Sequence, residues 1–98
     1  MYEREMELIK GAARIGKIVF RYHALKELRA ESFTTADAVH CILFGEIVED
    51  QIDRNGDLKF VIYGESVAKD EMGVITKWDD DRRVVVITAF QLEITDYD

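Results

Sequence analysis

Residues 45–64 read GEIVEDQIDRNGDLKFVIYG, and this stretch decides the fold. Before it, apolar residues recur every three or four positions, as on the buried side of a helix. Within it they alternate, as in a half-buried strand. The pair Asn55-Gly56 is a strong signal for a short hairpin turn. We therefore predict an antiparallel hairpin made of strands at residues 46–52 and 58–63.

Three helices are predicted before this hairpin and two strands after it. The helices cover residues 3–15, 22–31 and 35–44, and the strands cover residues 73–78 and 84–90, with a polar loop at 65–72. Lys17–Phe20 is either a short strand or an extended lead-in to the second helix. Helices followed by a strand meander are typical of an α+β domain. We expect N-terminal helices packed on a largely antiparallel four-stranded sheet, with a C-terminal tail from Leu92 that is frayed or forms an edge.

Size and composition favour one ordered domain over residues 1–98. Hydrophobic residues make up 48% of the chain and proline is absent, which is unlike a disordered segment. No apolar run approaches the roughly 18 residues of a membrane helix, and the start of the chain lacks the apolar segment of a signal peptide. Cys41 is the single cysteine, so no internal disulfide can form. These features predict a cytoplasmic protein that does not bind membranes.

The formal net charge of −7 is unevenly distributed along the chain. Residues 1–44 carry +1 and residues 45–98 carry −8. Because acidic surfaces repel phosphates, any RNA contact is expected from the first half, and duplex DNA is not expected as a ligand. The apolar strand at 84–90 is followed by an acidic tail. If the sheet leaves an edge strand free, acids near that edge would discourage self-association and favour a basic protein partner.

His23, Glu27 and Glu31 stand four residues apart on the helix predicted at 22–31, so they can share one face. His23 could act as a general acid or base with Glu27 as its partner. Imidazole and carboxylate at this spacing could also begin a divalent metal site, or His23 could bind a phosphate. The structural alternative is that His23 caps the helix or packs at the sheet edge, while the two glutamates are solvated or pair with Lys26 and Arg29. His40 is remote in sequence, so we assign no metal site and no cofactor.

Basic residues flank this histidine. Arg21, Lys26 and Arg29 could bind RNA phosphates and stabilise developing charge, or they could be solvated charges on a helix surface. Their arrangement in the folded protein discriminates between two functions. A concave basic surface around His23 favours an enzyme, whereas scatter over a convex surface favours a non-catalytic module.

The segment from Lys17 to Phe90, the motif-bearing core of the chain, resembles the DUF4258 domain. The motifs are the lead-in KIVF, His23-Ala24, the helix at Thr35–Phe44, the segment Gly45–Asp50, Gly64 and the strand Ile87–Phe90. Members of the family often carry arginines four and eight residues after the histidine. This sequence has Glu27 and Glu31 at those positions, and so resembles a branch of the family with acids there.

The order of elements in this family is similar to that of RelE-like toxins, small ribonucleases that an antitoxin neutralises. The resemblance implies a metal-independent endoribonuclease with His23 as the acid or base, Glu27 as its partner, and Arg21, Lys26 and Arg29 as phosphate-binding residues. It also implies an antitoxin-like partner or a homodimer. The missing arginines and the acidic second half of the chain support an alternative, a non-catalytic protein-interaction module of the same fold, such as a decayed toxin or a partner-binding subunit.

Overall fold

The hairpin predicted around Asn55-Gly56 is present, and an aspartate side chain holds its turn. The structure, a computed structural model, describes residues 1–92. Asp53 Oδ1 accepts hydrogen bonds from the backbone N–H of Asn55 at 2.9 Å and of Asp57 at 3.0 Å. Gly56 has a φ of +82°, a left-handed conformation that a residue without a Cβ adopts at little cost. The local sequence therefore closes the turn with its own polar groups.

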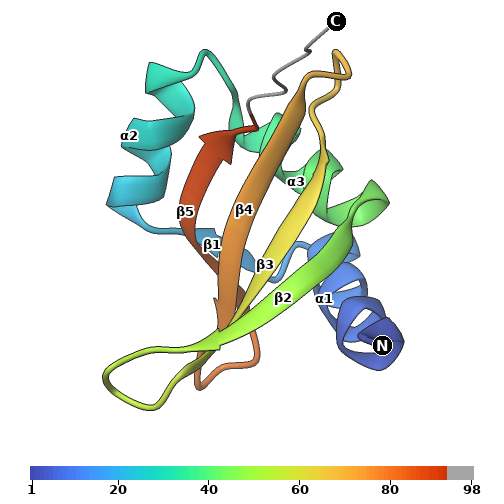
Figure 1. Cartoon of the computed structure of the whole chain (residues 1–98), viewed down its shortest axis with the longest axis vertical. Helices are drawn as coiled ribbons and strands as arrows, with labels where there is room; N and C mark the ends of the chain where they lie inside the picture. Colours follow the sequence, from blue (N-terminus) through green and yellow to red (C-terminus); the bar gives the residue numbers. More distant parts are fainter. Residues whose placement is uncertain (93–98) are drawn as a thin grey trace, which may run out of the picture.

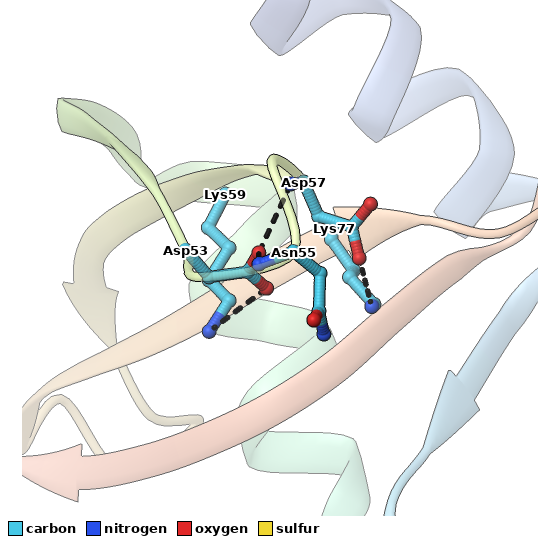
Figure 2. Close-up of polar contacts among 5 residues, drawn as sticks. All are labelled: Asp53, Asn55, Asp57, Lys59 and Lys77. Carbon is cyan, nitrogen blue, oxygen red and sulfur yellow. Dashed lines mark hydrogen bonds and ion pairs between the residues drawn. The ribbon is translucent and has the colours of Figure 1, made fainter.

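Two lysines tie this turn to the sheet, as Figure 2 shows. The ammonium group of Lys59 lies 3.6 Å from Asp53 Oδ2, and that of Lys77 lies 3.0 Å from Asp57 Oδ2. The hydrogen bond from the backbone N–H of Asp57 is the main reason why the pKa of the Asp53 carboxyl lies below its usual value. The carboxylate is thus held in its charged form by the same contacts that shape the turn.

The predicted helices are confirmed, with ends that differ by no more than one residue. They are α1 (Glu3–Arg14), α2 (Tyr22–Ala30) and α3 (Thr35–Phe44). The strands are β1 (Ile18–Phe20), β2 (Glu46–Ile52), β3 (Leu58–Glu65), β4 (Glu71–Trp78) and β5 (Val84–Gln91). The α+β class is therefore confirmed for the described residues.

The expectation of four largely antiparallel strands is wrong. The sheet has five strands in the order β1-β5-β4-β3-β2, and β1 runs parallel to β5, with Ile18 opposite Val84 and Phe20 opposite Val86. A three-residue strand has too short a pattern to reveal its partner. Here the partner lies more than sixty residues away in the sequence, so only the tertiary structure brings the two together.

The loop predicted at residues 65–72 is shorter in the structure. Glu65 and Glu71 are paired across β3 and β4, so both strands extend into the predicted loop. The turn between them is closed by Ser66, whose Oγ accepts a hydrogen bond from the backbone N–H of Asp70 at 3.0 Å. Apart from Leu92, the tail expected to be frayed or an edge lies outside the described residues. Within residues 1–92, no helix is both long and apolar enough to cross a membrane.

Helices α1 and α3 lie on one side of the sheet, behind it in Figure 1, and α2 lies beside β5. The face of β2–β5 toward the viewer carries no helix among the described residues. Between the helices and the sheet lies one apolar core. Its fully buried side chains include Ile9, Ile42, Ile62, Val74 and Val86.

Helix α3 approaches the hairpin so closely that two glycines are required. A Cβ on Gly64 would lie 2.6 Å from the carbonyl oxygen of Cys41, and a Cβ on Gly45 would collide with the carbonyl oxygens of Cys41 and Tyr63. The Cys41 thiol is fully buried in this contact, and burial raises its pKa to about 12. Cys41 is therefore a small core residue and not a reactive thiolate.

The opposite face of the sheet has its own tight contact. Tyr63, Gly73 and Phe90 are neighbours across β3, β4 and β5. The two aromatic rings meet edge to face, with centroids 6.2 Å apart. A Cβ on Gly73 would lie 2.6 Å from the Phe90 ring. The glycine gives the rings room to cover the backbone of β4.

We predict that Gly64→Ala lowers the free energy of unfolding by about 1–3 kcal/mol, because the added methyl group meets a backbone oxygen that cannot rotate away. The control is Gly11→Ala in α1, where an added Cβ meets nothing within 4 Å. That variant should be more stable by about 0.5–1 kcal/mol, through the greater helix propensity of alanine. Urea denaturation of dilute protein measures both. Equal stabilities of the two variants would contradict the close approach of α3 to β3.

Candidate functional site on helix α2

Helix α2 is held against the sheet by a backbone hydrogen bond at its start and by its own apolar residues. The backbone N–H of Arg21, the N-cap residue, donates to the carbonyl of Val86 at 3.0 Å and so extends the pairing of β1 with β5. One turn later Ala24 is fully buried and Leu28 is 2% exposed. These contacts dock α2 against β5 and leave its outer side in solvent (Figure 1).

Glu27 anchors the helix to the edge of β5. Its Oε1 accepts a hydrogen bond from the backbone N–H of Ala89 at 3.1 Å. Strand β1 pairs with β5 only as far as Val86, so beyond that point the edge of β5 has no neighbouring strand. The carboxylate of Glu27 takes the place of a strand partner at Ala89. A buried backbone N–H at a sheet edge is thereby satisfied.

The second carboxylate oxygen of Glu27 faces His23. Nε2 of His23 lies 3.4 Å from Glu27 Oε2, and the His23 side chain is 71% exposed. Glu27 is thus held between an imidazole in solvent and the backbone of β5. The contact places a carboxylate beside an imidazole, which is the pairing of groups that many general acid–base sites use. Glu31, predicted to share this face, is the C-cap residue of α2 and is exposed.

The basic residues assigned to phosphate binding take different positions around the helix axis relative to His23, and Lys26, three residues later, is about 60° from it. Successive residues of an α-helix are turned by about 100°, so Arg29 lies roughly 120° around the axis from His23. The ammonium group of Lys26 lies 5.6 Å from the ring centroid of Tyr22, on the solvent side of the helix. Arg21 caps the helix start with its backbone. The structure therefore brings His23 and Glu27 together, and within residues 1–92 none of the three basic side chains forms an ion pair.

Two grooves on the described surface lie away from α2. One groove of about 540 Å³ lies between the start of α1 and β2 and includes Tyr2, Met6, Lys10 and Gly45–Val48 in its lining. A second groove of about 560 Å³ lies on another side of α1. No residue of α2 lines either of these two grooves.

The sequence did not show that β2 is an edge strand. From the sequence, any free sheet edge is expected at the strand at 84–90, which is the most apolar one. In the structure β5 lies between β4 and β1, whereas β2 is at the end of the sheet. The acids of residues 46–52 were the available signal, because charged residues are common on edge strands. Among residues 1–92, no three side chains of histidine, cysteine, aspartate or glutamate form a group that could hold a metal ion.

The fold and the site define a small α+β protein in which one helix clamps the edge of a mixed five-stranded sheet and presents a histidine–carboxylate pair to solvent. The sequence pattern of the family described as "Domain of unknown function (DUF4258)" matches residues 20–91. This chain belongs to the DUF4258 family, and the resemblance drawn from its motifs is confirmed. Comparisons with curated proteins and with solved structures gave no match.

We predict that Glu27→Ala lowers the free energy of unfolding by about 1–2 kcal/mol, because the backbone N–H of Ala89 loses its acceptor. Glu27→Gln keeps an acceptor oxygen and should lose less. Hydrogen exchange measured by NMR should show faster exchange of the Ala89 amide in the alanine variant. Glu31→Ala, on the same helix, is the control and should leave that amide unchanged. An Ala89 amide insensitive to Glu27→Ala would show that the carboxylate does not hold this edge.

Proposed function

We propose that this protein is a protein-interaction module that binds an extended, basic segment of a partner along the outer edge of β2. The observation that carries the proposal is the position of β2 as an acidic strand at one end of the described sheet, beside a groove, while no residue of α2 lines either described groove. An edge strand offers a row of backbone donors and acceptors to an incoming strand.

The outer edge of β2 is available for such pairing. The strand hydrogen-bonds to β3 on one side and has no neighbouring strand on the other in the described part of the sheet. The groove of about 540 Å³ runs between this strand and α1. The register shifts at Val48, between Ile47 and Glu49, and the Val48 side chain is 43% exposed. A strand added here would have both backbone partners and a hollow for its side chains.

The charge of β2 selects the partner. Residues 46–52 contain Glu46, Glu49 and Asp50 and no lysine or arginine. Antiparallel pairing of two copies through this edge would place acids beside acids, which is unfavourable. A strand carrying lysine or arginine would instead meet opposite charges.

The rest of the chain is consistent with this reading. An antitoxin-like protein with a basic segment is one class of partner that fits the edge. Duplex DNA does not fit, because the second half of the chain carries −8. We place the protein in the cytoplasm, since its single cysteine is free and buried and suits a reducing compartment.

A second candidate function is metal-independent endoribonuclease activity of the RelE-like kind. The observation that favours it is the contact of 3.4 Å between His23 and Glu27. In this candidate His23 exchanges a proton with the RNA while Glu27 orients the ring. Arg21, Lys26 and Arg29 would supply charge to the phosphates, although they are spread around the helix start and its outer surface.

We predict that β2 binds a synthetic peptide that alternates lysine and valine and matches the strand in length. Amide signals of residues 46–52 should shift in NMR titrations, and affinity should fall as salt rises. Glu49→Lys should weaken binding roughly threefold to tenfold, since it replaces an attractive charge contact by a repulsive one. Glu31→Lys makes the same charge change on α2 and should leave the affinity unchanged.

A peptide that alternates glutamate and valine should not bind. Equal binding of the two peptides, or shifts confined to residues outside β2, would refute the proposed role of this edge.

The ribonuclease candidate makes a separate prediction. Purified protein should cleave single-stranded RNA in the presence of a chelator, and His23→Ala should reduce the rate by about 100-fold or more. His40→Ala is the matched control, because the Nδ1 atom of His40 contacts the carbonyl of Glu65 at 2.9 Å, away from α2. Induced expression in a bacterial host, with growth and RNA integrity as readouts, should separate wild type from His23→Ala. Intact RNA with every variant would eliminate this candidate and leave the interaction module.

A further inference from the structure

The second groove, which we call the α1 groove, differs from the β2 edge in its chemistry. It has a volume of about 560 Å³ and a largely apolar lining. The residues that line it are Glu7, Leu8, Gly11, Ala12, Ile15, Lys17, Trp78 and Arg82. The groove lies between one side of α1, the end of β4 and the turn that follows β4.

Gly11 lines the α1 groove, and no contact within residues 1–92 requires a glycine at this position. It lies inside α1, where glycine costs about 1 kcal/mol relative to alanine. A Cβ there would meet nothing within 4 Å. By contrast, a Cβ on Gly45 or Gly64 would collide with a backbone oxygen. The missing side chain of Gly11 therefore leaves open space on the surface, which suits the close approach of another backbone.

The walls of the groove are apolar and exposed. Leu8 is 56% exposed and Ile15 is 71% exposed. Leu8, Gly11 and Ile15 follow one another at three- and four-residue spacing, so they form one stripe along the helix. Trp78 borders the stripe from β4. An apolar helical stripe with a glycine at its centre has the shape for packing against a second helix.

The charges at the two ends of the groove are opposite. Glu7 lies toward the start of α1, and Lys17 and Arg82 lie past its end. Within residues 1–92, none of these three side chains forms an ion pair. A surface with an acid at one end and bases at the other is complementary to itself when turned by 180°.

We propose that a second copy of this chain docks in the α1 groove, with the two α1 helices antiparallel about a twofold axis and Glu7 of each copy beside Lys17 of the other. The helices cross at Gly11, and Leu8 of one copy packs against Ile15 of the other. Because of the twofold axis, each of these contacts occurs two times in the dimer. Because one 12-residue helix supplies most of the surface, the interface is smaller than the roughly 1,600 Å² of standard complexes, and the dimer is weak.

This dimer uses a different groove from the proposed binding at β2, and Glu7 is a residue that lines both grooves. Self-pairing through β2 is opposed by its acids, whereas the α1 groove carries both signs of charge. Association through α1 would leave two β2 edges free. A dimer could then hold two partner segments at once and gain affinity through the effective concentration of the second site.

The test is sedimentation equilibrium over a concentration series, with charge reversals at both ends of the groove. Wild type should approach twice the monomer mass of 11.3 kDa at high concentration. Glu7→Lys and Lys17→Glu should each weaken self-association about tenfold or more, because each places like charges together twice. An equimolar mixture of the two variants should restore the dimer, since both contacts then join opposite charges. Lys10→Glu makes the same charge change as Lys17→Glu on another side of α1 and should alter the affinity less than about twofold.

Gly11→Ala provides a second readout. It should raise the stability of dilute protein by favouring the helix, yet weaken the dimer by filling the open space beside Gly11. A wild-type protein that stays at 11.3 kDa at every concentration overturns the proposal and leaves the groove to a different protein. Loss of association in both charge variants without recovery in their mixture would also overturn it, because the two ends would then not meet.

Discussion

The contact of α3 with the hairpin at Cys41 is the constraint on which the rest of the structure depends. The carbonyl oxygen of Cys41 occupies the space that a side chain on Gly45 or Gly64 would need. The helix backbone therefore rests on the strand backbone without an intervening side-chain layer. This brings Ile42 into the core above Ile62, and it sends β2 away from α3 toward the edge of the sheet. With β2 and β3 placed, antiparallel pairing adds β4 and β5 in turn, and β5 receives β1 and α2.

Glu27 shows how one side chain can support two interpretations. Read from the sequence, it is the carboxylate partner of a histidine one turn away. In the structure it also caps the backbone of Ala89, where β1 has ended and β5 would otherwise leave a donor unpaired. A change at Glu27 would therefore disturb both the proton partner of His23 and the edge of the sheet. A loss of activity in a Glu27 variant would therefore not by itself assign a chemical role to Glu27. Hydrogen exchange of the Ala89 amide reports the contact with the sheet edge separately from the contact with His23.

The uneven charge of the chain has a structural counterpart. The acidic half forms β2–β5, and the acids of β2 are the basis on which we propose a basic partner for this edge of the sheet. The nearly neutral first half forms α1 and α2, where acids and bases are mixed. The partner binding and the self-association that we propose use different grooves, which have Glu7 in common. Small domains with one core have few places for function, and our two proposals use the exposed edge of β2 and the outer side of α1.

The sequence by itself determined the local elements, because their causes are local. The Asn55-Gly56 turn and the helical spacing of apolar residues depend on neighbours a few positions away. The same holds for the N-cap at Thr34, whose side chain and that of Asp37 bond to each other's backbone N–H. The pairing of His23 with Glu27 was predictable for the same reason, since residues four apart share a helix face.

Only the tertiary structure decided the parallel pairing of β1 with β5, the edge position of β2, the contact of Glu27 with Ala89 and the groove beside Gly11. The two contacts join segments that are distant in the sequence. The edge position and the groove depend on the lack of a neighbouring segment among the described residues. Short strands carry no signal for their partners, and an empty space above a glycine leaves no trace in a hydrophobic pattern. Periodicity shows which side of an element is buried, but the identity of the neighbour emerges only when the whole chain packs around one core.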